Sequence, residues 1–235
     1  MLPVNPVQTD PPRATARRRP ARGAMSLLAA AAAACLAVSD APRALGADAG
    51  GGTKTIVAFG DSLTAGLGVP IEDAYPARLE RRLRAEGYDY RVVNAGVSGD
   101  TTAGGLRRVD WALRSRPAIA IVELGANDGL RGLPVPLMRA NLAGIIERFQ
   151  AAGVAVVLAG MKVPPNYGPD YSRTFAVVFS DLARRYRTPL IPFFLDGVAG
   201  VDALTQPDGL HPTSEGYRVI VDRIWPVLKP LLARP

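Results

Sequence analysis

Short apolar runs alternate with longer amphipathic segments along the chain from residue 53 onward. Runs typical of β-strands lie at residues 55–59, 90–94, 118–124, 154–159 and 190–193. Apolar residues at helical spacing mark segments 76–87, 104–115, 138–153 and 174–186, and a last helix is expected after His211. This alternation predicts repeated βαβ units, and therefore an α/β domain built on five mostly parallel strands.

The ends of the first three predicted strands are rich in glycine and carry polar side chains. They read FGDSLTAG, NAGVSGDTTAGG and ELGANDGLRG. In an open parallel sheet, ligands bind in the crevice at the carboxyl ends of the strands. Glycine there permits compact turns and lets a ligand approach the backbone N–H groups closely. We therefore expect the functional site in these three loops.

The first 49 residues have the pattern of an export signal. Four arginines between residues 17 and 22 precede the apolar run 24–38, which is too short and too weakly hydrophobic to span a bilayer. Small residues follow, so that cleavage after Gly46 or Ala49 would suit a signal peptidase. The pattern predicts a leader and linker over residues 1–49, one folded domain over residues 50–235, and a periplasmic or secreted protein without a membrane-spanning segment after processing.

The formal net charge of the whole chain is +7. Beyond the leader it is only +4, because 22 basic and 18 acidic residues remain there. The arginines are scattered along the predicted helices and form no block interleaved with aromatic residues. This distribution is typical of solvated helix faces rather than of a nucleic-acid-binding surface, and we expect no nucleic-acid partner.

Cys35 is the single cysteine of the chain, so neither an intramolecular disulfide nor a thiolate metal site is possible. Two interpretations remain open for this residue. It is either discarded with the leader or, because Ala32–Cys35 resembles a bacterial lipobox, it carries a lipid anchor. Both interpretations place the protein outside the cytoplasm.

The chain has one histidine, His211, in the segment QPDGLHPTSEG before the last predicted helix. A lone histidine is commonly structural, but Asp208 lies three residues earlier. An Asp-x-x-His turn can bring the carboxylate beside the imidazole, where it fixes the tautomer and stabilises the protonated ring. The spacing favours a general base oriented by an acid.

Ser62 follows the first predicted strand and is the candidate nucleophile. A serine in a strand-to-helix turn is usually a helix N-cap, and the two roles can coexist. A serine hydroxyl attacks at neutral pH only when an adjacent base removes its proton, so Ser62 and His211 make chemical sense together. Gly99 and Asn127 are candidate oxyanion donors beside the Ser62 N–H, although either residue can also serve a turn.

The segments GDSLT, SGD, GAND and DGLH together resemble the four sequence blocks of the SGNH (GDSL) hydrolases. The chain is similar to the secreted bacterial thioesterase I/lysophospholipase L1 and arylesterase branch over residues 53–232. The resemblance implies a flavodoxin-like three-layer α/β/α fold and hydrolysis of carboxylic esters, and also of thioesters, through an acyl-enzyme. It implies Ser62 as nucleophile, His211 as base, Asp208 as orienting acid, and the Ser62 N–H, Gly99 and Asn127 as oxyanion donors.

Several other enzyme classes fit poorly. The G-x-S-x-G elbow of ordinary α/β-hydrolases is absent, as are both glycine-rich nucleotide fingerprints. With one histidine and no dense carboxylate cluster, we expect no catalytic metal and no cofactor. Three acids within the motifs, Asp61, Asp100 and Asp128, are interpreted as bracing their loops through hydrogen bonds to backbone amides.

The substrate is a small ester or thioester on this interpretation, and the candidate acyl groove is apolar. Leu130, Leu133 and Val135 follow Asn127, and Val163 and Tyr167 come from a later loop; these five residues either roof such a groove or simply anchor their loops. Two other functions are compatible with the same site residues. One is a carbohydrate O-deacetylase, and the other is an acyl-binding protein that does not catalyse a reaction.

Overall fold

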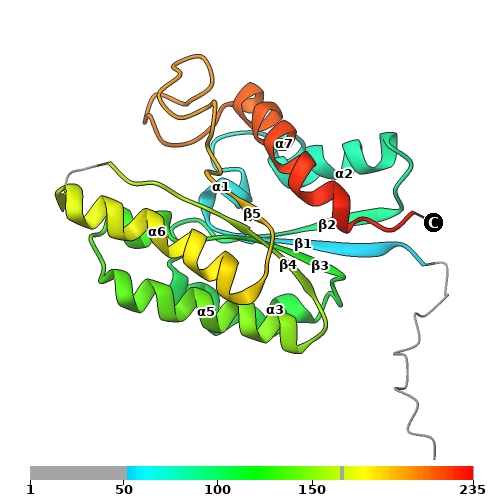
Figure 1. Cartoon of the computed structure of the whole chain (residues 1–235). Coiled ribbons are helices and arrows are strands. Elements are labelled where there is room, and N and C mark those ends of the chain that lie inside the picture. Colours follow the sequence, from blue (N-terminus) through cyan, green and yellow to red (C-terminus); the bar gives the residue numbers. More distant parts are fainter. Residues whose placement is uncertain (1–51, 165–166, 235) are drawn as a thin grey trace, which may run out of the picture. The chain divides into compact units, whose positions relative to one another are not determined.

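A computed structural model of the chain describes residues 52–164 and 167–234. Its sheet consists of β1 (Lys54–Gly60), β2 (Tyr90–Gly96), β3 (Ile119–Glu123), β4 (Ala155–Ala159) and β5 (Leu190–Ile191). All pairings are parallel and the strand order is β2-β1-β3-β4-β5. The α/β class with five strands, predicted from the alternation of patterns, is confirmed, and the sheet is entirely parallel (Figure 1).

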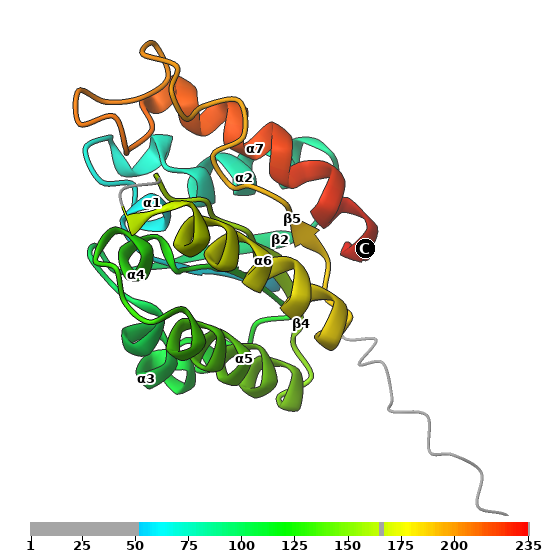
Figure 2. The same cartoon turned by 60° about the vertical axis from the view of Figure 1, so that its left-hand side comes forward.

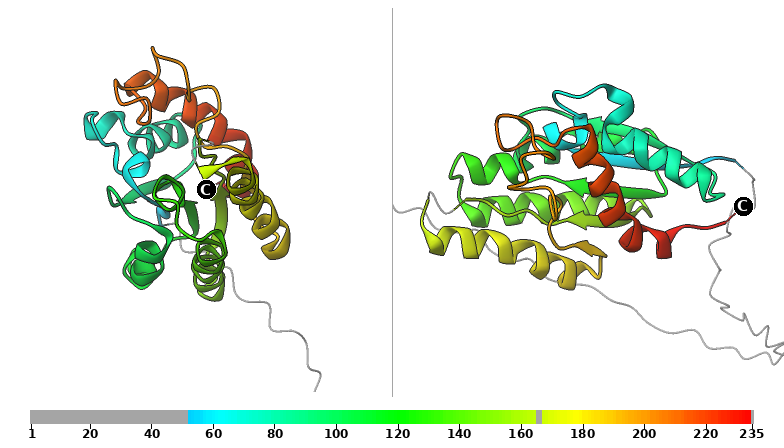
Figure 3. Two further views of the ribbon diagram at one scale, coloured as in Figure 1. Left: turned by 90° about the vertical axis from the view of Figure 1, so that its left-hand side faces the viewer. Right: turned by 90° about the horizontal axis from the view of Figure 1, so that it is seen from above.

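Helices cover both faces of the sheet and complete three layers (Figures 1, 2 and 3). One face carries α2 (Tyr75–Ala85) and α7 (Ser214–Leu228); the other carries α3 (Thr102–Leu113), α5 (Val135–Ala151) and α6 (Pro169–Tyr186). All five residues of β3 are buried, because strands covered on both faces meet no solvent. The short elements are α1 (Ser62–Ala65), α4 (Ala126–Leu130) and the 3₁₀ turns Ile71–Asp73 and Lys229–Leu231.

Proline accounts for the main differences between predicted and observed boundaries. Helix α5 begins three residues before the predicted start and α6 five residues before it, and each has a proline in its first turn. Proline is well suited there because its missing N–H would have no helical partner. Strand β5 ends at Ile191, two residues earlier than predicted, because Pro192 has no N–H to offer the sheet.

The strand order reverses between β1 and β3, and this point fixes the place of the site. Gly60, the last residue of β1, is paired with Gly96 of β2 on one side and with Glu123 of β3 on the other. Three strands therefore end at one level, and the loops that follow them share one edge of the sheet. A crevice outside this edge is the expected ligand site of a doubly wound fold.

The predicted leader, residues 1–49, and Cys35 lie outside the described residues, so the division into leader and folded domain stays a prediction. Within residues 52–164 and 167–234, none of the helices combines the length and the apolar character needed to cross a bilayer.

Candidate active site

The turn after β1 leaves the Ser62 hydroxyl free for chemistry. Ser62 is the first residue of the short helix α1, and the N-cap is Asp61, whose Oδ1 accepts the Leu63 N–H at 3.0 Å. Because Asp61 satisfies the helix end, Ser62 is not the cap that its position suggested. The segment was expected to form a compact turn, and it forms a single helical turn ending in the left-handed Gly66 (φ 83°).

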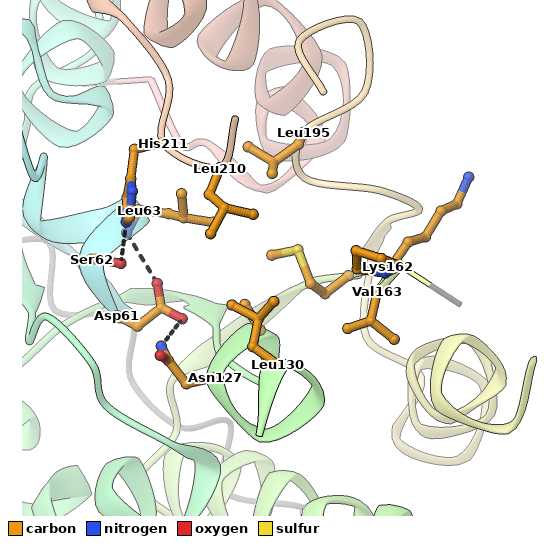
Figure 4. A pocket seen from close by; sticks show the side chains of 13 residues that line it. Asp61, Ser62, Leu63, Asn127, Leu130, Lys162, Val163, Leu195, Leu210 and His211 are labelled. Carbon is orange, nitrogen blue, oxygen red and sulfur yellow. Dashed lines mark hydrogen bonds between the residues drawn. The ribbon is translucent and has the colours of Figure 1, made fainter. Parts of the chain in front are cut away.

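The hydroxyl of Ser62 faces His211 (Figure 4). His211 Nε2 lies 2.9 Å from Ser62 Oγ, and its Nδ1 lies 2.6 Å from Asp208 Oδ2. The structure thus brings together the three residues that the sequence put forward as nucleophile, base and acid. Asp208 Oδ1 also accepts the backbone N–H groups of Leu210 and His211, at 2.9 and 3.0 Å, so that one carboxylate shapes the turn and holds the ring.

These contacts keep Asp208 ionised. Its pKa falls to about 2, first because the His211 N–H donates to it, then because the Leu210 N–H does, and then through the imidazole itself. An ionised acceptor beside Nδ1 selects the tautomer with a proton on Nδ1. Nε2 is then an acceptor for the Ser62 O–H, which is the arrangement a general base requires.

The loop that carries His211 is tied to the loop that follows Ser62. Gln206 Nε2 donates to the Leu67 carbonyl at 2.8 Å and to the Pro212 carbonyl at 2.9 Å, and the Gln206 N–H donates to the His211 carbonyl at 2.7 Å. Gln206 therefore bridges the two segments whose separation sets the distance between nucleophile and base. Sequence analysis did not identify this residue, because no motif marks it.

The candidate oxyanion donors come from three loops. Asn127 Nδ2 donates to Asp61 Oδ2 at 3.1 Å, and since an amide has two hydrogens, the second one is left for a ligand. Gly99 adopts φ 78°, which favours glycine, and its carbonyl accepts Arg131 Nη2 at 2.9 Å. This contact ties the peptide between Gly99 and Asp100 to the segment after α4, the helix that carries Asn127.

A cavity of about 250 Å³ opens at Ser62 and His211 (Figure 4). Besides these two residues, its walls comprise Asp61, Leu63, Ala126, Asn127, Leu130, Met161, Lys162, Val163, Pro164, Leu195 and Leu210. Most of these side chains are apolar, and the polar ones except Lys162 gather at the nucleophile, whereas Lys162 lies on the opposite side of the cavity (Figure 4). A cavity of this kind is suited to an acyl chain whose carbonyl lies at the polar end.

Of the five residues expected to roof this cavity, Leu130 and Val163 line it, whereas Leu133, Val135 and Tyr167 do not. Val135 is buried in the core at the start of α5. Tyr167 lies against Gly132 and donates its hydroxyl to the Leu130 carbonyl at 3.1 Å, so it braces the outside of the loop. The alternative interpretation, that of buried loop anchors, therefore fits Val135, whereas Leu133 is partly exposed and Tyr167 is half exposed.

Sequence reasoning missed much of the cavity wall. Met161, Lys162 and Pro164 follow β4, while Leu195 and Leu210 come from the segments that precede α7. Their signal was weak, because each lies in an irregular segment without periodicity. What could have been inferred is that the carboxyl end of β4 opens onto the same edge as those of β1 and β3.

The three motif acids brace their loops, though not all in the expected way. Asp61 accepts from a backbone amide, and Asp128 accepts both the N–H and the hydroxyl of Thr102, at 2.8 and 2.6 Å. Asp100 instead pairs with the Arg108 guanidinium at 2.7 Å.

Arg108 joins the ends of two strands beneath the site. Its Nη2 donates to the Gly60 carbonyl and its Nη1 to the Ala95 carbonyl, both at 2.7 Å, while its Nε faces Asp100. The planar guanidinium makes the three contacts from three separate nitrogens, whereas a lysine would have to make them all from one. Arg108 therefore holds the carboxyl ends of β1 and β2 together under the loops that bear Ser62 and Gly99.

Comparison with known proteins places this geometry in context. The sequence profile of the GDSL-like lipase/acylhydrolase family matches residues 58–219. Esterase TesA of Pseudomonas aeruginosa is 46% identical over 180 residues, which cover 76% of this chain and 90% of that protein. Thioesterase 1/protease 1/lysophospholipase L1 of Escherichia coli K12 is 35% identical over 179 residues, 76% of this chain and 85% of that protein.

A solved structure with the same fold is that of the psychrotrophic esterase EstA from Pseudoalteromonas sp., inhibited by monoethylphosphonate. It superposes with a TM-score of 0.72 at 38% identity and covers 75% of this chain and 97% of that one.

Proposed function

The chain belongs to the GDSL-like lipase/acylhydrolase family and is an ester and thioester hydrolase of the GDSL type, and on this premise we propose that Ser62, His211 and Asp208 form its catalytic triad. One observation carries the proposal: His211 Nε2 lies 2.9 Å from Ser62 Oγ while its other ring nitrogen faces an ionised Asp208. A nucleophile, a base and an orienting acid are thereby in contact in that order.

The reaction begins when the ester carbonyl carbon lies against Ser62 Oγ. His211 Nε2 takes the hydroxyl proton as Oγ forms its bond to that carbon, and Asp208 stabilises the imidazolium. The tetrahedral oxyanion then accepts hydrogen bonds from the Ser62 N–H, the Gly99 N–H and the second amide hydrogen of Asn127. His211 returns the proton to the leaving alkoxide or thiolate, which departs and leaves an acyl-Ser62 ester.

Water completes the cycle. His211 removes a proton from a water molecule that attacks the acyl-enzyme carbonyl, and the second tetrahedral species collapses with transfer of that proton to Ser62 Oγ. The products are the free acid and the regenerated enzyme.

Acyl chains of short to medium length are the substrates that the cavity favours. Leu130, Met161, Val163 and Leu195 offer an apolar wall beside the nucleophile. The volume of about 250 Å³ accommodates a chain of several carbons but leaves little room for a polymer. This apolar lining also supports an acyl ester over an acetylated sugar as the preferred substrate.

The assignment of Ser62 is tested with a fluorophosphonate probe, which forms a covalent bond with an activated serine. Stoichiometric labelling of the purified protein, mapped to Ser62 by peptide mass, is the expected result. A folded protein that the probe does not modify would instead favour the acyl-binding function without catalysis.

Export is a second part of the proposal, and it rests on the sequence of residues 1–49 alone. Arginines before a short apolar run and small residues after it support a cleaved signal peptide and a periplasmic or secreted enzyme. The mass of the mature N-terminus decides between the two forms: a start after Gly46 or Ala49 indicates a free enzyme, and a diacylated Cys35 indicates a lipid anchor.

A further inference from the structure

A carboxyl side chain is completely buried beneath the nucleophile turn. Glu123, the last residue of β3, has no exposed surface and lies opposite Gly60 in the sheet. Its Oε2 accepts the Thr64 hydroxyl at 2.8 Å and the Asp61 N–H at 3.4 Å. Its Oε1 has no hydrogen-bond partner within the described part of the chain.

The turn rests directly on this side chain. A Cβ placed on Gly60 would lie 2.5 Å from Glu123 Oε2 and 2.0 Å from Thr64 Oγ1, so glycine alone fits between strand and carboxyl. Both groups that donate to Glu123 flank Ser62 closely in sequence. Any change in the position of this carboxyl therefore moves the backbone that carries the nucleophile.

No cation offsets a charge on Glu123 among the described residues that surround it. The titratable groups that face it are Asp61 from the turn before α1, Tyr75 from α2 and Tyr217 from α7. Asp61 is itself fully buried, and its N–H donates to Glu123 Oε2 at 3.4 Å, so that two acids are buried side by side. Two acids that are buried side by side without a cation cannot both stay ionised, because burial and the charge of each disfavour the charge of the other.

Asp61 is the partner that needs the charge. It accepts the Leu63 N–H and the Asn127 amide, and two donors favour its ionised form. Burial raises the pKa of Asp61 to about 6, and burial together with the charge of Asp61 raises the pKa of Glu123 well above its ordinary range. The proton is thus retained by Glu123 at the pH where Asp61 has lost its own.

We propose that Glu123 is a positioning residue that carries a proton in the working enzyme and, as a neutral acceptor for the Asp61 N–H and the Thr64 hydroxyl, holds the turn that bears Ser62 in place. Glu123 fixes the Asp61 backbone and the Thr64 side chain, Asp61 caps α1 and accepts from the Asn127 amide, and α1 carries Ser62. A neutral acid at this place adds no second negative charge beside the developing oxyanion. The inference rests on the proposed roles of Ser62 and Asn127.

Two variants of similar size test the role of this proton. Glu123→Gln keeps an oxygen that can accept from the Thr64 hydroxyl and the Asp61 N–H, without any charge. Glu123→Leu removes this acceptor. For a p-nitrophenyl ester we expect kcat of Glu123→Gln within about threefold of the parent, and kcat of Glu123→Leu lower on the order of 10²-fold, because displaced reacting groups cost that much. KM should change little in either variant.

The rate of fluorophosphonate labelling at Ser62 should follow kcat, which a purely structural role would not require. A folded Glu123→Gln variant that loses activity would overturn the proposal, since the ionised form would then be the working one. A Glu123→Leu variant with parental kcat and labelling rate would overturn it as well. If Glu123→Leu does not fold, the Gln variant alone still decides.

The proton can also be observed directly. In protein labelled with ¹³C at the glutamate carboxyl carbon, the signal that disappears in Glu123→Gln identifies residue 123. We expect this signal to keep the shift of a protonated acid at pH 7; titration near the ordinary glutamate pKa of about 4.3 would overturn the proposal. This outcome does not depend on catalysis, so it separates failure of the inference from failure of the triad. Failure of the triad would instead appear as a parent protein that fluorophosphonate does not modify at Ser62.

Discussion

His211 Nε2 lies 2.9 Å from Ser62 Oγ although 149 residues separate the two in the chain. The nucleophile is placed by the end of β1 and its short helix, and the base by the turn that precedes α7. Gln206 joins the two segments by donating to the Leu67 and Pro212 carbonyls. The contact is therefore set by a hydrogen-bonded bridge between loops as well as by the sheet.

Replacement of Asp208 by Asn should lower kcat by about 10²–10⁴-fold and leave KM nearly unchanged. The neutral amide no longer stabilises the imidazolium and can select the wrong tautomer of His211. Because the pKa of Asp208 is about 2, the carboxylate stays ionised throughout the neutral and mildly acidic range. The ratio of the parental kcat to that of Asp208→Asn should therefore stay constant from pH 5 to 9. A comparable kcat in the two proteins would exclude a role of Asp208 in catalysis.

Replacement of Asn127 by Ala should reduce kcat by about 10²–10³-fold, because one oxyanion donor is lost. Asp61 loses an amide partner in the same variant. Thr102→Val, which removes a hydroxyl that donates to Asp128 outside the cavity, is the matched control for lost hydrogen bonds in this region. Steady-state kinetics on one aryl ester compare the three proteins, and an equal decrease in both variants would argue against an oxyanion role.

Leu130 and Leu133 lie in one loop, but Leu130 alone of the two lines the cavity. Leu130→Ala should lower the ratio of kcat/KM for octanoate over acetate by about 3- to 30-fold, since each buried methylene contributes about 0.8 kcal/mol. Leu133→Ala should leave this ratio unchanged. Rates on p-nitrophenyl acetate, butyrate and octanoate provide the measurement, and an identical chain-length profile in all three proteins would place the acyl site elsewhere.

Glu123 should make the stability of the folded protein depend on pH. Because its pKa is raised by burial and by Asp61, the folded chain keeps a proton that the unfolded chain releases above about pH 4.3. The stabilisation from this proton is complete below that pH and is lost as the pH rises toward the pKa of the folded state. Relative to Glu123→Gln, the parent should lose up to about 1.4 kcal/mol of unfolding free energy per pH unit above pH 4.3.

Urea denaturation of both proteins at pH 5, 6 and 7 gives this difference. Asp61 titrates near pH 6 in the parent, and its contribution is shared by the two proteins to a first approximation. A difference that stays constant over the three pH values would show that Glu123 has an ordinary pKa.

The sheet and the contact between Ser62 and His211 could be anticipated from the sequence because each has a local signal. The strands are uninterrupted apolar runs, as both faces of a parallel sheet are buried. Asp208 and His211 are separated by the spacing of a turn, and Ser62 follows a strand directly. Patterns of this kind can be recognised in a single sequence without knowing which segments pack against each other.

Other features depend on contacts between distant segments and leave no such signal. Glu123 reads as an ordinary residue at the end of a strand, and only the fold shows that it lies opposite Gly60 with no cation beside it among the described residues. Gln206 and Arg108 act through carbonyl groups, which every residue possesses. Val135 and Tyr167 were assigned to the cavity because they follow Asn127 or lie in an apolar loop, but the direction of a side chain in an irregular segment is set by tertiary packing.

The central claim, that Ser62 attacks the ester, is tested most directly by the turnover of p-nitrophenyl butyrate by the purified parent and by Ser62→Ala. We predict that the variant loses about 10⁴-fold or more of kcat, because removal of the nucleophile leaves binding and oxyanion stabilisation alone. Its melting temperature should change by no more than about 2 °C, since one hydroxyl is removed at the edge of the core. A folded Ser62→Ala variant that turns over the ester at the parental rate would contradict the account.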